Sequence, residues 1–305
     1  MVAADGPPEV VQQGPTARRR EHAPASGPGV SVVIPTRDRP AELDRAIASA
    51  LAQDPPPFEV IVIDDGERPA VVRDQPLVRV VRLAAPRGDP GAARNLGVAE
   101  ARGELIAFLD DDDVWHAGKL RRQVDALGDA AATACGFQVL DARGRVVERH
   151  LPVASDLRRE LLLRPILQPS GLLVRRRVLQ RVGGFAEGRR CEDWALFLRL
   201  AEHARVILQP EVMVTRRPSA KTVEEQFEAL VALYEQDIAP RIAPRDRPRV
   251  EAHHRLIRGV LLARMGRRRA ALRLLARSSA PWQTLRVLIG ERGWATLRRL
   301  VRYAS

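Results

Sequence analysis

Residues 30–63 set the fold class, because they contain two apolar segments, Val30-Ser-Val-Val-Ile-Pro35 and Phe58-Glu-Val-Ile-Val-Ile63. Runs of β-branched residues of this length predict buried strands. Apolar residues recur at helical spacing from Ala41 to Gln53, so the three segments together predict a β-α-β unit. Further strands are predicted at 78–83 and 104–109, with a helix at 91–101 between them. Such alternation indicates an α/β fold with a parallel sheet covered by helices on both faces.

The second half of the chain is less periodic. Its pattern predicts strands at 132–140, 144–149 and 205–208, and helices at 156–163, 192–203 and 222–236.

Composition divides the chain into three parts. Residues 1–29 are rich in Pro, Gly, Arg and Ala and lack the apolar segment of a signal peptide, which predicts a disordered leader. Residues 30–240 are expected to form the main domain. A Pro- and Arg-rich linker then introduces residues 241–305, where helical patterns occur at 249–277 and 282–303 and predict a C-terminal α-helical appendage.

The positive charge of the protein is concentrated in that appendage. The 305 residues carry a formal net charge of +12, yet residues 241–305 alone contain 17 arginines and three acidic residues, a net charge of +14. The first 240 residues therefore have a net charge of −2, with 33 basic and 35 acidic side chains. Hydrophobic residues make up 45% of the chain and charged residues 29%, a balance that excludes a disordered polymer or a collagen-like fibre.

Two interpretations of the arginine-rich appendage stay open. Its arginines could solvate the outer faces of packed helices. Alternatively, the apolar side that contains Leu256, Leu261 and Leu272, with arginines around it, could lie on an anionic membrane surface.

Cysteine content and hydropathy indicate a cytoplasmic protein, with peripheral attachment to the inner face of the membrane as an option. The two cysteines, Cys135 and Cys191, have no metal-ligand spacing, which favours a reducing compartment. Arginines interrupt every apolar segment, so a membrane span is not expected.

Polar clusters follow three of the predicted strands. They are Thr36-Arg-Asp-Arg39, Asp64-Asp65-Gly66 and Asp110-Asp-Asp-Asp113. Ligands of open α/β sheets bind beyond the carboxyl ends of the strands, so we expect the three clusters to line one crevice. Four consecutive aspartates repel one another unless a cation or hydrogen-bond donors neutralise them, and Mg²⁺ or Mn²⁺ prefers such oxygen ligands. The alternative is that one aspartate caps the following helix while the others are solvated.

Three further segments are ambiguous when each is taken alone. Asp64 and Asp65 could form a turn, or could accept hydrogen bonds from a nucleobase or a ribose. Arg94 lies near the start of a predicted helix that suits a phosphate. Glu192 and Asp193 could simply stabilise the start of the helix that follows them.

Taken together and in order, these segments resemble the family 2 glycosyltransferases over about residues 30–215. The matching segments are Val30–Pro40, Glu59–Gly66, Gly91–Asn95, Phe108–Trp115, Val182–Phe185 and Glu192–Trp194. The resemblance implies the GT-A fold, in which a mixed sheet is flanked by helices, and it identifies residues 30–240 as the catalytic domain. It also implies a nucleotide-diphospho-sugar donor and an acceptor hydroxyl on a glycan, a lipid-linked molecule or a small molecule.

The resemblance assigns roles residue by residue. The residues placed at the nucleotide-sugar are Pro35, Thr36, Arg37, Asp64, Asp65, Arg94, Asp110 and Asp111. Asp65 would bind the base, and Arg94 would face the base or the diphosphate. Asp112 would be the direct ligand of Mg²⁺ or Mn²⁺ in the DxD region, and Asp193 would be the general base of an inverting, hexosyl-type transfer.

Two departures from the family pattern affect these roles. Gly66-Glu67-Arg68 stands where relatives carry Ser-Asp, and the late histidine of many relatives is replaced by Thr215-Arg216-Arg217-Pro218. Arg216 or Arg217 could contact the diphosphate in its place.

Other functional classes fit the sequence less well. A non-catalytic sugar-nucleotide-binding relative would not be expected to keep both the acidic run and Glu192-Asp193. A nucleotidyltransferase would carry a Gly- and Arg-rich loop after the first strand, where Pro35-Thr36-Arg37-Asp38 stands. A nucleic-acid partner is not expected, because aromatic residues are scarce in the basic region and no binding motif is present there.

Overall fold

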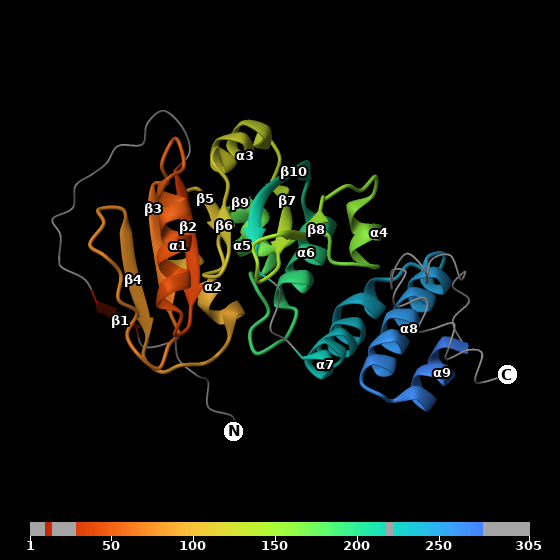
Figure 1. The fold of residues 1–305 in the computed structure, drawn as a ribbon. Coiled ribbons are helices and arrows are strands. Elements are labelled where there is room, and N and C mark those ends of the chain that lie inside the picture. The colour runs from red at the N-terminus through yellow and green to blue at the C-terminus, as the bar shows by residue number, and fades with distance from the viewer. Residues whose placement is uncertain (1–9, 14–28, 218–221, 277–305) are drawn as a thin grey trace, which may run out of the picture. The chain divides into compact units, whose positions relative to one another are not determined.

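The computed structural model describes residues 10–13, 29–217 and 222–276 (Figure 1). Contacts divide the chain into two units. Unit 1 comprises residues 1–161 and 165–219, and unit 2 comprises residues 162–164 and 220–305. The division falls after residue 219, whereas the sequence places a domain boundary after residue 240. The extent of the catalytic domain therefore stays a prediction.

Unit 1 is built on one mixed sheet. Its strands are β1 (Val10–Gln13), β2 (Val30–Thr36), β3 (Glu59–Asp64), β4 (Val78–Leu83), β5 (Leu105–Phe108), β6 (Val114–Trp115), β7 (Ala132–Leu140), β8 (Val146–His150), β9 (Leu172–Arg175) and β10 (Val206–Arg216). They lie in the order β1-β4-β3-β2-β5-β9-β7-β10-β6, and β8 pairs with β7. Its helices are α1 (Pro40–Leu51), α2 (Pro90–Glu100), α3 (Lys119–Leu127), α4 (Leu157–Leu161), α5 (Arg176–Val182) and α6 (Glu192–His203).

Parallel pairing is confined to two parts of this sheet. Strands β4, β3, β2 and β5 are mutually parallel, as the β-α-β pattern predicts. Strand β9 then enters between β5 and β7 and runs antiparallel to both, while β7 and β10 are parallel. The sequence predicts neither β9 nor the two-residue strand β6, which lie outside the strands that its periodicity indicates.

The edge strand β1 lies within the segment for which the sequence predicts a disordered leader. It pairs antiparallel with β4, with Val10 opposite Leu83. Without β1, the outer edge of β4 would present unpaired N–H and C=O groups, so pairing with an additional strand is physically favourable. The rest of the leader lies outside the described residues.

Close packing of α2 on the sheet requires a glycine. A Cβ atom on Gly97 would lie 2.2 Å from Cγ1 of Val33, a fully buried residue of β2. Any side chain here would push the helix away from the strand. Gly97 therefore sets the distance at which α2 presents Arg94, three residues earlier, to the carboxyl ends of the strands.

A lysine lies fully buried beneath the sheet. Lys119 donates to Oε1 of Gln123 at 2.6 Å, and its ammonium lies 4.0 Å from the centroid of the Trp115 ring. Burial lowers the pKa of Lys119 to about 8. Gln123 and Trp115 in turn donate to the carbonyl oxygens of Gly171 and Ser170. The buried amine therefore supports the turn that precedes β9.

Lys119→Met is expected to change the pH dependence of folding stability. The folded-state pKa is depressed, so above about pH 8 the folded protein has lost this proton while the unfolded chain still holds it. Raising the pH from 8 to 10 therefore favours the folded wild type, by about 2 kcal/mol relative to the variant. Urea unfolding of both proteins across this pH range measures the difference between their free energies of unfolding. The contributions of other titrating groups are the same in both proteins and cancel in that difference. A difference that is constant with pH would contradict the prediction.

The regular elements of unit 2 are all helical within its described residues. It contains α7 (Val223–Leu233), a π turn (Tyr234–Ile238), a 3-10 turn (Ala239–Arg241), α8 (Arg247–Arg264) and α9 (Arg268–Ala276). These helices confirm the helical prediction for 249–277, with a break at Gly266, whose φ of 75° ends α8. The helix predicted at 282–303 lies outside the described residues.

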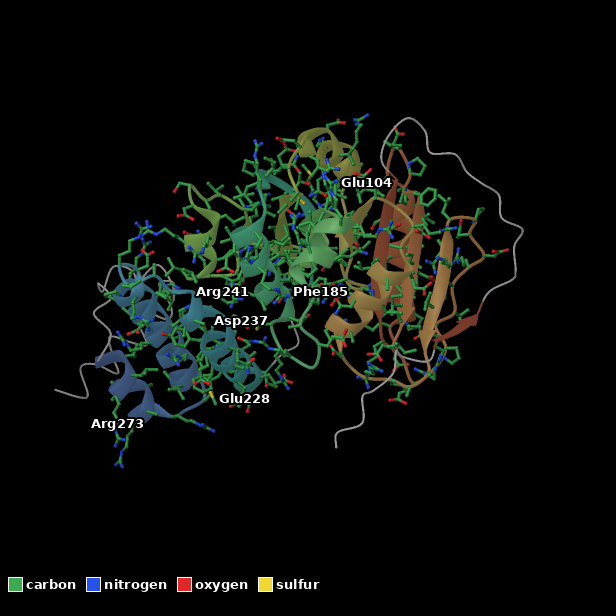
Figure 2. The ribbon with its side chains drawn as sticks, turned by 180° about the vertical axis from the view of Figure 1, so that it is seen from behind. Glu104, Phe185, Glu228, Asp237, Arg241 and Arg273 are labelled. Carbon is green, nitrogen blue, oxygen red and sulfur yellow. The ribbon has the colours of Figure 1, made fainter. Side chains whose placement is uncertain are left out.

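The apolar side of α8 packs inside unit 2. Leu256 and Leu261 are buried, and a Cβ on Gly259 would lie 2.7 Å from side-chain atoms of Leu275. Arg273 on α9 is exposed and extends away from the helix (Figure 2). Leu272 on α9 is 37% exposed, so both interpretations of the arginine-rich region stay open and contact with an anionic membrane stays a prediction. Among the helices of the described residues, none is both long and apolar enough to cross a bilayer.

Candidate functional site

The polar clusters that follow β2, β3 and β5 meet at one edge of the sheet, as the sequence predicts. Thr36 and Asp64 are register partners at the ends of β2 and β3. The N–H of Asp65 donates to the carbonyl oxygen of Thr36 at 2.9 Å, and Oγ1 of Thr36 donates to Oδ2 of Asp111 at 2.8 Å. Parallel strands end at the same edge, which explains why residues 75 positions apart come into contact.

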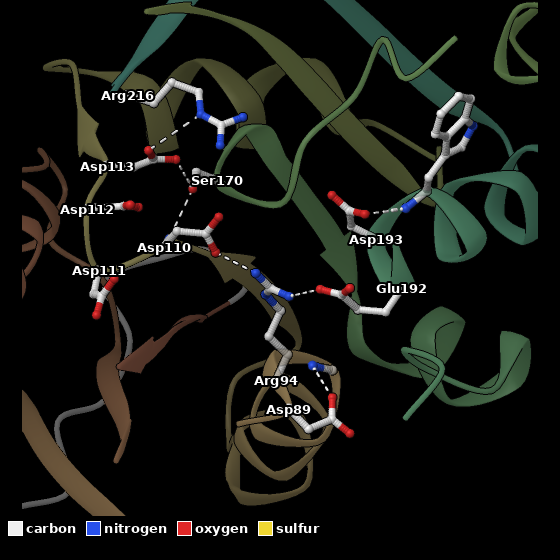
Figure 3. Close-up of polar contacts among 12 residues, drawn as sticks. Asp89, Arg94, Asp110, Asp111, Asp112, Asp113, Ser170, Glu192, Asp193 and Arg216 are labelled. Atoms are coloured by element: carbon white, nitrogen blue, oxygen red, sulfur yellow. Dashed lines mark hydrogen bonds and ion pairs between the residues drawn. The ribbon is translucent and has the colours of Figure 1, made fainter. Parts of the chain in front are cut away.

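Three arginines surround the four aspartates that follow β5. Arg94 contacts Asp110, with 2.6 Å between Nη2 and Oδ1 (Figure 3). Nη1 of Arg39 lies 3.2 Å from Oδ1 of Asp111 and 3.1 Å from Oδ2 of Asp112. The third arginine is Arg216, whose Nε lies 3.9 Å from Oδ1 of Asp113. These cations offset the mutual repulsion of the carboxylates.

Ser170 joins the two ends of the acidic run. Its hydroxyl donates to Oδ2 of Asp113 at 2.6 Å and accepts from the N–H of Asp110 at 3.0 Å (Figure 3). Asp113 is 1% exposed, and burial together with the Asp110 carboxylate raises the pKa of Asp113. Ser170 is fully buried, so its role in the fold is to support the acidic run.

A buried arginine connects the acidic run to the Glu192-Asp193 pair. Arg94 places Nη1 2.8 Å from Oε1 of Glu192 while Nη2 contacts Asp110 (Figure 3). Its guanidinium also lies 5.2 Å from the ring centroid of Phe185. Burial, followed by the neighbouring Asp193, raises the pKa of Glu192. Oδ1 of Asp193 accepts from the N–H of Trp194 at 2.7 Å, at the start of α6.

The start of α2 is held by its own cap and by the turn at 184–188. Oδ1 of Asp89 accepts from the N–H groups of Gly91 and Ala92, and Oδ2 accepts from the N–H of Gly188 at 2.6 Å. A Cβ on Gly91 would lie 2.9 Å from the carbonyl oxygen of Ala186. Asp89 therefore caps the start of the helix that carries Arg94, and a phosphate contact at this helix start stays a prediction.

The two aspartates after β3 are engaged with backbone groups. Asp64 accepts from the N–H groups of Gly66 and Ala70, both at 2.9 Å, and from Arg82 at 3.0 Å. Asp65 accepts from the N–H groups of Arg87 and Gly88, at 2.5 and 2.7 Å. Each carboxylate oxygen has a further lone pair that can accept a second hydrogen bond, so these backbone contacts leave acceptors for a base. Binding of a base by Asp65 stays a prediction.

The remaining predicted contacts lie at the same edge. Pro35 and Thr36 close β2, and Arg37 is half-exposed, with Nη2 3.6 Å from Oε1 of Glu67. The arrangement also brings in Arg39 and Glu192, which the sequence does not assign to the site. Arg39 belongs to the polar cluster after β2, and membership of that cluster is the sequence signal that could have identified it as a site residue.

The acidic run suits a divalent cation in its donor chemistry. The side chain of Asp112 is 37% exposed, and Oδ1 of Asp113 is a buried oxygen without a hydrogen-bond partner among the described residues. No group of three or more His, Cys, Asp or Glu side chains converges on a metal position within the described residues. Mg²⁺ is usually held by one or two carboxylates together with substrate phosphates, so Asp112 fits this role.

Comparisons with known sequences identify relatives of the chain. A family model described as glycosyl transferase family 2 matches residues 31–183. The succinoglycan biosynthesis protein ExoO of Rhizobium meliloti is 40% identical over 119 residues, which cover 37% of this chain and 34% of ExoO. An uncharacterized glycosyltransferase of Nostoc sp. is 31% identical over 170 residues, which cover 50% of this chain and 52% of that protein. The chain thus spans about half or less of these two relatives.

Solved structures share the fold at low sequence identity. The mannosyltransferase PcManGT from Pyrobaculum calidifontis, solved with GDP-Man and Mn²⁺, has a TM-score of 0.56 and 19% identity, covering 91% of this chain and 81% of that chain. TarS of S. aureus has a TM-score of 0.52 and 19% identity, covering 81% and 55%. Both the mixed sheet and these neighbours establish the GT-A fold. The chain belongs to glycosyl transferase family 2.

Proposed function

We propose that this protein transfers a sugar, of the hexosyl type, from a nucleotide-diphospho-sugar to an acceptor hydroxyl, with inversion at the anomeric carbon. Membership of the family supports the reaction class. Structures of neighbours include PcManGT with GDP-Man and TarS with UDP-GlcNAc, which supports a nucleotide-sugar donor here.

One observation carries the proposal. The acidic run and the Glu192-Asp193 pair, about eighty residues apart in sequence, are joined through the two arms of Arg94. On one side of the reacting sugar, the negative diphosphate needs cations and needs the charge of nearby carboxylates to be neutralised. On the other side, the acceptor hydroxyl needs a base. Arg94 holds these two groups of carboxylates in one site.

Asp193 is the proposed general base. The acceptor oxygen attacks the anomeric carbon as the bond between that carbon and the diphosphate oxygen breaks, and Asp193 takes the hydroxyl proton. The neighbouring Glu192 is buried and paired with Arg94, so it is unsuited to meet an acceptor. A single displacement of this kind inverts the anomeric centre.

Asp112 is the proposed ligand of Mg²⁺ or Mn²⁺. A bound cation of this kind neutralises the diphosphate leaving group. The chain's own contribution is to hold the acidic run in place. Ser170 secures both ends of the run, and Thr36 secures Asp111 from β2. Pro35, Arg37, Asp64, Asp65 and Asp110 are proposed to line the donor site.

A nucleoside diphosphate of the correct base is expected to stabilise the full chain only when Mn²⁺ or Mg²⁺ is present. Ligand at one hundred times its Kd stabilises a protein by about 2.7 kcal/mol. For a domain of this size that corresponds to a rise in Tm of roughly 5–10 °C. Thermal unfolding with UDP, GDP and other diphosphates, in Mn²⁺ and in EDTA, measures this effect.

Turnover is tested with the same protein and a panel of sugar nucleotides that includes UDP-GlcNAc and GDP-mannose. Release of nucleoside diphosphate reports transfer to an acceptor or to water, and proton NMR of the first product reports its anomeric configuration. If no nucleotide stabilised the protein and no sugar nucleotide in the panel released its nucleoside diphosphate, the proposed function would be contradicted. A product that retains the donor configuration would contradict the single displacement.

A further inference from the structure

We propose that Arg39 is a resident counter-ion of Asp111 and Asp112, and that it competes with the divalent cation for the Asp112 carboxylate. The inference rests on the proposed function, because it concerns the cation that this function uses. It assigns to Arg39 control over how tightly the site binds the cation.

The contacts place the Arg39 guanidinium on the carboxylate proposed as the metal ligand. One nitrogen, Nη1, bridges Oδ1 of Asp111 at 3.2 Å and Oδ2 of Asp112 at 3.1 Å. Arg39 lies just before α1, 73 positions from Asp112 in sequence. Asp111 keeps a second donor, the hydroxyl of Thr36, whereas Arg39 is the partner that the structure gives to Oδ2 of Asp112.

Exposure separates Arg39 from the other arginine that is hydrogen-bonded to the acidic run. The side chain of Arg94 is 6% exposed, and its two arms are bound to carboxylates. Releasing it would leave buried charges uncompensated, which is costly. The side chain of Arg39 is 51% exposed, and an exposed ion pair contributes little net stability. Arg94 is therefore a fixed part of the site, while Arg39 can leave Asp112 at small cost.

Electrostatics determines the direction of the effect. The guanidinium of Arg39 lies against the Asp112 carboxylate, and its positive charge repels a divalent cation that binds the same carboxylate. We therefore expect binding of the divalent cation to displace Arg39 from Asp112. Removing the Arg39 charge leaves the carboxylates unneutralised without metal and makes them a stronger cation site.

The test is Mn²⁺ binding to the full chain, measured by EPR of free Mn²⁺ in the absence of nucleotide. Arg39→Gln is expected to lower the Kd for Mn²⁺ by about three- to tenfold, and Arg39→Lys, which keeps the charge, is expected to change it less. Asp112→Asn should lose this binding in either background. Arg45→Gln is the matched control, because Arg45 is a half-exposed arginine paired with Glu42 on the adjacent helix α1.

Thermal unfolding distinguishes competition from a merely structural role. Arg39→Gln is expected to have a lower Tm than wild type in EDTA and a larger increase in Tm on adding Mn²⁺. Mn²⁺ binding that is unchanged or weaker in Arg39→Gln would overturn the inference, as would absence of Mn²⁺ binding from all the proteins. Sugar transfer by the wild type is measured separately, so failure of the proposed function would be recognised independently of these results.

Discussion

Asp193→Asn is expected to lower kcat for sugar transfer by about 10²- to 10⁴-fold while leaving donor binding unchanged. A positioned general base contributes an acceleration of that size, and an amide cannot accept the proton. Transfer is measured as release of nucleoside diphosphate in the presence of acceptor. Donor binding is measured as the increase in Tm produced by the nucleoside diphosphate with Mn²⁺.

The structure explains why Asp193 rather than Glu192 is changed in this experiment. Glu192 is 7% exposed and bound to Arg94, so its substitution would disturb the support of the site. Asp193 is only half-buried, and its assigned contact is local, to the N–H of the next residue. Its negative charge near the start of α6 interacts favourably with the helix dipole, so the substitution should cost no more than about 1 kcal/mol of stability.

Glu202→Gln provides the control for Asp193→Asn. Glu202 lies near the other end of the same helix, where its carboxylate is 3.7 Å from Arg158. This variant should keep full turnover. If Asp193→Asn also kept full turnover, Asp193 would be removed from the mechanism, and loss of donor stabilisation would assign it to donor binding instead.

Arg94→Met is expected to cause the largest loss of stability among single substitutions at the site. It leaves the carboxylates of Asp110 and Glu192 without their shared cation, and breaking a buried ion pair costs about 3–5 kcal/mol. The cation–π contact with Phe185 is lost as well. For a unit of this size the Tm should fall by roughly 10 °C. Urea unfolding and thermal unfolding both measure the change.

Three additional variants test the ion-pair explanation for Arg94. Arg94→Lys should recover only part of the stability, because an ammonium cannot reproduce the planar, two-armed contact of a guanidinium. Glu192→Gln in the Arg94→Met background should recover part of it by removing one uncompensated charge. Arg45→Met, at an exposed pair, should cost less than about 1 kcal/mol. Equal costs for Arg45→Met and Arg94→Met would show that burial of the pair is not the cause.

The elements of residues 30–100 could be predicted from sequence because their signals are local. The β-branched segments at β2 and β3 and the helical spacing of α1 specify their own secondary structure. The rule for parallel strands then predicts that Thr36, Asp64 and the acidic run end at one edge of the sheet, and the structure confirms it.

The position of β9 could not be predicted in the same way. Its four residues pair antiparallel with β5 and β7, and this insertion brings Ser170 against Asp110 and Asp113. Nothing in residues 172–175 specifies which strands they will lie between. The support that Ser170 gives to the acidic run is therefore visible only in the structure.

By itself, the sequence determined the family, the α/β elements and the acidic run, because these depend on the order and periodicity of neighbouring residues. Only the tertiary structure decided how the charges are paired. Arg94 meets Glu192 across 98 positions, and Arg39 meets Asp112 across 73. A chain with 48 arginines offers every carboxylate many candidate partners. Helix packing and strand order select among them, because an ion pair forms only between side chains that the fold brings within a few ångströms.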